Sequence, residues 1–230
     1  MNRNSVLIPE IYASNPQDGK VLEYYKGYFE AVYIMLHPFY RGISMDLGSI
    51  NNDDWPTDQE LREGCVSVSW QEVIKLTKFQ NFSQIDIGLR TLFGALNKDV
   101  ANENYALELE RLFIDNGILY PDATGIISPF LSDAILKCLN KLNYTKLWQV
   151  DEFSYQPAIL YNLDELLISQ QTHHCNYTED HKVLFATHWD SQCTFLCSSK
   201  EIIEKILEIY PFEGFFCTPN TEVYWGLHDI

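Results

Sequence analysis

Apolar residues recur at helical spacing between residues 21 and 36. Within "VLEYYKGYFEAVYIMLHPF", an apolar or aromatic side chain returns every three or four positions, at Val21, Tyr25, Tyr28, Phe29, Val32 and Leu36. Pro38 disfavours helical geometry in the residue before it, so the predicted helix ends at His37. Its nearly all-aromatic face is typical of a core helix, and a groove lined with tyrosines is the alternative.

Five more helices are predicted from start and stop signals between residues 57 and 145. In a capping box, a Ser or Thr side chain and a Glu three residues later satisfy free backbone donors at the start of a helix. Thr57 with Glu60 and Ser69 with Glu72 fit this motif and predict two helix starts. Ser83 with Asp86 predicts the start of the next helix. The last two are bounded by a stop at Gly117 and by a Ser128–Pro129 start.

The pattern changes after residue 145. "KLWQVDEF" alternates as a strand does, and the remainder reads strand, strand, helix, strand, with Ser198 and Glu201 as the predicted cap of that helix. We therefore predict an α+β fold, with a mainly helical region at 1–145 and an α+β region at 146–230 that holds a small, mostly antiparallel sheet and a packed helix. No linker separates the two regions, so one continuous domain is an equal alternative.

Charge is the strongest global signal. The 230 residues include 16 Lys plus Arg against 32 Asp plus Glu, a formal net charge of −16. Such a surface repels phosphate backbones and anionic membranes and attracts a basic protein, although acidity that serves only solubility is the alternative. No window approaches the roughly 18 apolar residues of a membrane span, and the six cysteines are expected to be reduced. We expect a cytoplasmic protein without a cofactor.

One segment concentrates this acidity. "NNDDWPTDQELREGC" offers a docking patch for a basic partner, formed by Asp53, Asp54, Trp55, Asp58 and Glu60. The alternative is an ordinary solvated face.

Residues 69–98 have the rhythm of a helix-turn-helix. The turn "KFQNFS" holds two phenylalanines instead of a glycine, and the second helix offers Arg90 and Lys98 as its cations. With a strongly negative chain, this pattern indicates structural helix packing rather than DNA binding.

The stretch from His173 to Cys193 holds four of the six histidines. Cys193 and Cys197 lie in a predicted strand, which places them on one face but about 13 Å apart, too far to share a metal. A two-residue turn at "SQ" sets Asp190 opposite Cys193 and His188 opposite Phe195. His188, Asp190 and Cys193 are therefore candidate catalytic residues, with His188 as general base beside a thiol; the alternative is a hydrogen-bonded histidine at the edge of the core.

The polar loop before this hairpin holds potential metal ligands. Ligation by His173, His174, Cys175 and His181 needs partners that only the fold supplies, of which Cys217 is one candidate. We assign no metal, and the common catalytic motifs are absent from the sequence.

Five segments resemble a family of bacterial proteins of about this length that is known only as a domain of unknown function: "YIMLHPFYRG", "VSWQEVIKL", "LRTLFGALNK", "ATHWDSQCTFLC" and "EGFFCTPNTEVYWG". The resemblance implies no active site, ligand or activity. The leading hypothesis is a non-catalytic protein-interaction module, which binds a basic partner as small acidic immunity proteins bind nuclease toxins. The alternative is an enzyme of unknown class that uses the 186–197 hairpin.

Overall fold

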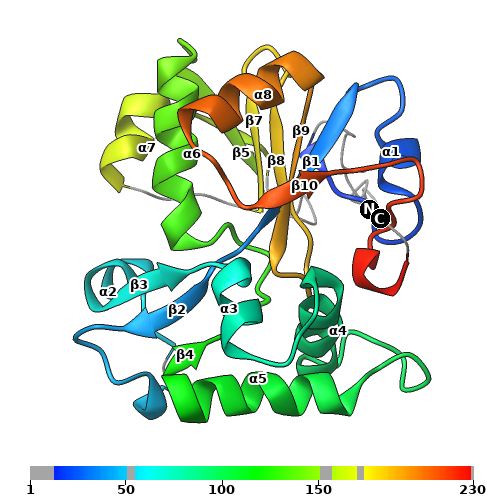
Figure 1. Cartoon of the computed structure of the whole chain (residues 1–230). Coiled ribbons are helices and arrows are strands. Elements are labelled where there is room, and N and C mark those ends of the chain that lie inside the picture. The colour runs from blue at the N-terminus through cyan, green and yellow to red at the C-terminus, as the bar shows by residue number, and fades with distance from the viewer. Residues whose placement is uncertain (1–12, 51–54, 151–156, 170–173, 229–230) are drawn as a thin grey trace, which may run out of the picture.

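A computed structural model describes residues 13–50, 55–150, 157–169 and 174–228. Two antiparallel sheets, one of seven strands and one of three, organise these residues. Figure 1 shows the large sheet above the small one, with helices packed against both.

The larger sheet draws its strands from both ends of the chain. Its order is β10-β1-β9-β8-β7-β5-β6, and every neighbouring pair is antiparallel. β1 lies between β9 and β10, so residues from the start of the chain are hydrogen-bonded to residues near its end. The strands are β1 (Ala31–Leu36), β5 (Lys146–Val150), β6 (Ile159–Asn162), β7 (Cys175–Thr178), β8 (Leu184–Thr187), β9 (Cys193–Ser198) and β10 (Gly214–Phe216).

Three helices cover one face of this sheet: α6 (Pro129–Lys141), α7 (Leu163–Ser169) and α8 (Lys200–Ile209). Alternate strand residues, including Met35, Phe185 and Leu196, pack with Ile135 of α6 and Ile206 of α8 in one buried cluster. The two-residue period of the strands sends their remaining side chains to the opposite face.

The opposite face packs against four elements: α1 (Val21–Tyr24), α3 (Trp70–Leu76), α4 (Phe82–Leu92) and the short 3₁₀ helix η3 (Trp225–Leu227). Ile34, Phe195 and Leu89 belong to this second cluster, in which the rings of Trp70 and Trp225 lie 6.0 Å apart. α5 (Glu103–Asn116) packs on α4 and ends at Gly117, whose φ of +62° matches the predicted stop.

The smaller sheet has the order β3-β2-β4 and a core of its own. Its strands are β2 (Phe39–Gly42), β3 (Cys65–Val68) and β4 (Ile118–Leu119), joined by η2 (Leu47–Ser49) and α2 (Asp58–Gly64). α2 begins at the predicted capping box, because the Thr57 side chain accepts from Glu60 N and the Glu60 side chain accepts from Thr57 N.

The predicted helical N-terminal part is wrong. The run that suggested a helix up to His37 forms only the four-residue α1 and then β1, whose side chains are buried on both faces of the sheet. A strand buried on both sides reads as a continuous apolar run, which periodicity does not distinguish from a buried helix. The sheet is therefore large and spread along the chain, rather than small and C-terminal.

Two predicted helix starts are displaced. The Asn81 side chain, not Ser83, caps α4 by accepting from Gln84 N, and Ser199, not Ser198, caps α8. In each case another polar residue, two positions earlier or one position later, caps the helix instead. No helix in the described ranges combines the length and the apolar character needed to cross a membrane.

Candidate functional site

The hairpin that contains the candidate catalytic residues has a longer loop than predicted. Ala186 lies opposite Phe195 and Thr187 opposite Thr194, so residues 188–192 form the connection and the predicted pairing is wrong by two residues. A shift by two keeps every side chain on its face. Leu184, Ala186, Phe195 and Cys197 therefore share one face, as predicted, and lie in the core.

His188 is buried at the start of this loop, with 5% of its surface exposed. Burial and, to a smaller extent, the Arg90 charge lower the pKa of His188 to about 4, while hydrogen bonds with the backbone of Trp189 and Gln17 oppose the shift. The imidazole is therefore neutral at pH 7.

Cys193 lies at the first position of β9 and is also buried. Burial raises the pKa of its thiol to about 11, although the Arg90 charge opposes the shift. The thiol donates a weak hydrogen bond to the Ser191 hydroxyl, with Sγ and Oγ 3.8 Å apart. A protonated, buried thiol that does not pair with His188 in this structure lacks the activation of a nucleophile.

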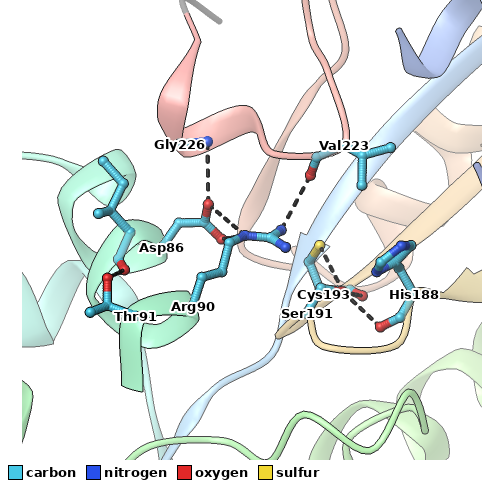
Figure 2. Close-up of polar contacts among 9 residues, drawn as sticks. Asp86, Arg90, Thr91, His188, Ser191, Cys193, Val223 and Gly226 are labelled. Carbon is cyan, nitrogen blue, oxygen red and sulfur yellow. Dashed lines mark hydrogen bonds and ion pairs between the residues drawn. The ribbon is translucent and has the colours of Figure 1, made fainter. Parts of the chain in front are cut away.

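A buried ion pair lies next to these two residues (Figure 2). Arg90 Nε donates to both carboxylate oxygens of Asp86 at 2.9 Å, and Nη2 donates to Val223 O at 3.2 Å. The Asp86 carboxylate also accepts from Gly226 N at 3.2 Å. The pair thus joins α4 to the C-terminal segment around η3.

Several buried polar atoms around this pair have no hydrogen-bond partner within the part of the chain that the structure describes. They include Arg90 Nη1 and both amide atoms of Gln192. Such atoms are commonly satisfied by buried water. The cluster lies in the interior, behind the β8–β9 loop.

The outer side of the same loop lines an open pocket of about 360 Å³. Four separate segments form its walls: the segment before α2, the C-cap of α4, the loop after β4 and the β8–β9 loop. The last two are joined, because Asp190 N donates to Ala123 O at 3.2 Å. The lining residues, which we call the acidic aromatic pocket, are Trp55, Phe93, Tyr120, Asp122, Ala123, Thr124, Trp189 and Asp190.

Acidic groups inside and beside the pocket are partly withdrawn from water. Burial raises the pKa of Asp190, while a hydrogen bond to the Trp189 side chain and the Arg90 charge oppose the rise. Burial also raises the pKa of the nearby Asp58. The Arg62 charge opposes this rise, and the Asp122 charge adds to it. Asp58 and Asp122 are therefore close enough for their charges to interact.

The two predicted sites meet at this pocket. Trp55, from the predicted acidic patch, and Asp190, from the predicted catalytic set, line the same cavity, and Asp58 lies near Asp122. Glu60 is exposed and occupied in the capping box, where its Oε2 accepts from Thr57 N at 2.8 Å. Asp53 and Asp54 lie outside the described residues.

The histidine and cysteine side chains that were candidate metal ligands lie in different surroundings. Cys175 is buried in β7, while His181 is exposed at a turn with a φ of 59°. His173 lies outside the described residues. In the ranges that are described, no three His, Cys, Asp or Glu side chains are grouped so as to hold a metal ion.

Sequence reasoning missed Phe93, Tyr120 and Asp122. The stretch "YPDATG" after β4 showed the proline and glycine of a loop, but nothing marked it as functional. Only the fold brings it beside Trp55 and Trp189, which are distant in the sequence.

Comparisons with known proteins give the following matches. A family model described as "Protein of unknown function (DUF2711)" matches residues 17–227. A Bacillus subtilis (strain 168) protein, printed as "Uncharacterized protein YwbB", is 25% identical over 175 residues, which are 74% of this chain and 77% of that protein. No solved structure matches the chain.

Proposed function

The chain belongs to the family described as a protein of unknown function (DUF2711), and on that premise we propose that it is a non-catalytic protein-interaction module whose binding site is the acidic aromatic pocket. The observation that supports this most is that Trp55, Trp189, Asp122 and Asp190, from distant segments, line one cavity. Tryptophan and tyrosine are the residues most enriched at the energetic centres of protein interfaces.

Charge supports a basic partner. The chain has a formal net charge of −16, and the pocket adds two carboxylates to four aromatic rings. A field of this sign accelerates encounter with a basic protein and opposes approach to nucleic acid or an anionic membrane.

If a partner binds at the pocket, removal of the most exposed ring of the pocket should weaken the binding. Trp189 is 47% exposed, so Trp189→Ala deletes contact surface without opening the core. In a capture experiment from a lysate of the native host at about 50 mM salt, we expect the wild-type protein to retain a basic protein and Trp189→Ala to retain at least about tenfold less. Raising the salt to about 0.5 M should release it, because screening shortens the reach of the charges.

The matched control is Tyr28→Ala. Tyr28 is 59% exposed and lies outside the pocket, so its removal should leave capture unchanged. A captured protein that both variants retain equally, or the absence of any captured basic protein, contradicts the proposal.

The alternative proposal is an enzyme that uses His188, Asp190 and Cys193. A catalytic thiol requires a thiolate, whereas burial raises the pKa of Cys193 to about 11. We expect iodoacetamide at pH 7.5 to label Cys193 in the folded protein more than about 100-fold more slowly than in the urea-unfolded protein. Peptide mass spectrometry measures both rates, and fast labelling of Cys193 in the folded protein supports the enzyme.

A further inference from the structure

The carboxylates of the acidic aromatic pocket form no ion pair with the residues that the structure describes. Within the described ranges, no nitrogen of Lys, Arg or His lies within 4.0 Å of the carboxylate of Asp122 or Asp190. Arg62 pairs with Asp58 at 3.6 Å, and Arg90 is buried against Asp86. Neither carboxylate is thus neutralised by a direct ion pair, although the Arg90 charge acts on Asp190 from a distance.

Hydrogen bonds fix one of these carboxylates and leave part of it open. Asp122 Oδ1 accepts from Thr124 N at 3.2 Å and from Thr124 Oγ1 at 2.8 Å. Its Oδ2 accepts no hydrogen bond from the described residues. An oriented carboxylate with an open oxygen is suited to a donor that arrives from outside.

Four aromatic rings line the pocket together with the carboxylates. Phe93 and Tyr120 pack edge to face, with centroids 5.5 Å apart, while Trp189 remains about half exposed. The face of an aromatic ring attracts a cation, and tryptophan does so most strongly. Aromatic walls with carboxylates between them therefore favour an organic cation over a neutral ligand.

A bare metal ion fits this pocket poorly, because the described residues contain no group of three or more potential ligands. Between the two cationic side chains of proteins, arginine fits better than lysine. Its planar guanidinium stacks on rings and also donates several hydrogen bonds to carboxylates, whereas the lysine ammonium is a compact, strongly hydrated charge. A volume of about 360 Å³ lies at the small end of the range for ligand pockets, which suits one side chain.

We propose that the acidic aromatic pocket binds a single arginine side chain of the partner, with its guanidinium between the aromatic rings and the carboxylates of Asp122 and Asp190. This inference rests on the proposed function, since the partner presents the arginine. The rings supply stacking area, and the carboxylates supply charge and direction.

The test titrates the ¹⁵N-labelled full chain with N-acetyl-L-arginine N-methylamide and follows its NMR spectrum. We expect saturable binding with a dissociation constant on the order of 1 mM. The indole signals of Trp55 and Trp189 should shift, whereas those of Trp70 and Trp225, each 1% exposed, should not. The citrulline analogue, which has the same shape but no charge, and the lysine analogue should each bind at least about tenfold more weakly.

Conservative variants test whether Asp122 and Asp190 supply the charge that binds arginine. The double variant Asp122→Asn, Asp190→Asn should weaken binding of the arginine derivative at least about tenfold. Asparagine tolerates the φ of 59° at position 190, so the loop conformation is preserved. The matched control Glu179→Gln, at an exposed acidic position outside the pocket, should bind as the wild type does.

Equal binding of arginine and citrulline, tighter binding of lysine, or full binding by the double variant overturns this inference. These failures are distinct from a failure of the proposed function. Capture that depends on Trp189 without a preference for arginine leaves the proposed function standing. Arginine binding at the pocket without any captured partner shows that the pocket chemistry is right and the partner proposal wrong.

Discussion

An Asp86→Ala variant is expected to lose about 3–5 kcal/mol of its free energy of unfolding, because it leaves a buried arginine without its counter-charge. Arg90 is 0% exposed, so bulk solvent does not reach the guanidinium charge. The same substitution also removes the acceptor of Gly226 N. Urea unfolding at pH 7.5, followed by circular dichroism, measures the loss.

A surface pair of the same spacing provides the control. Asp133 and Lys137 are also four residues apart on a helix, but the lysine side chain is 63% exposed, so Asp133→Ala should cost less than about 1 kcal/mol. A double variant Asp86→Leu, Arg90→Met should recover much of the loss, since a buried pair replaced by apolar side chains is often as stable. A single variant Asp86→Ala that unfolds at wild-type urea concentrations contradicts this role of the pair.

The folded protein is expected to lose stability as the pH falls from about 6.5 toward 4, because two histidines are buried in their neutral form. Burial lowers the pKa of His37 to about 3 and that of His188 to about 4. Each histidine binds a proton near pH 6.5 in the unfolded chain but not in the folded chain. The stability that the two neutral histidines contribute is therefore fully present above pH 6.5 and is lost as the pH falls. Each histidine should remove about 3 kcal/mol by pH 4.

The same titration also relieves repulsion among the carboxylates of a chain with a formal net charge of −16, an effect of opposite sign. The test therefore compares variants. The slope of unfolding free energy against pH between 6.5 and 4.5 should be smaller in His188→Asn than in the wild type. It should be unchanged in the control Ile168→Ala, which removes an exposed side chain without an ionisable group. Equal slopes for His188→Asn and the wild type contradict the account of His188.

Local signals in the sequence predicted local structure well. The capping box of Thr57 and Glu60, the helix start at Ser69 and the stop at Gly117 all appear where expected, because each depends on neighbours within a few residues. The run at 31–36 misled because its burial depends on β9 and β10, which are more than 150 residues away in the chain. The spacing of apolar residues gives no information about these partner strands.

For the candidate site too, the sequence indicated individual residues but not their arrangement in space. Trp55 and Asp190 stood out in the sequence for their local chemistry, but their shared cavity follows from a contact between the β8–β9 loop and the loop after β4. Asp86 and Arg90 read as a helix cap and a surface cation, and only the packing of η3 on α4 shows that they form a buried pair. Distant packing thus determined which of the marked residues reach a common site.

The measurement that tests the central claim most directly is competitive elution of the captured partner from the immobilised wild-type protein. If the acidic aromatic pocket binds an arginine of the partner, N-acetyl-L-arginine N-methylamide at about ten times its dissociation constant should release most of the partner. The citrulline analogue at the same concentration and ionic strength should release little. Equal release by the two compounds, or release by neither, would contradict the claim.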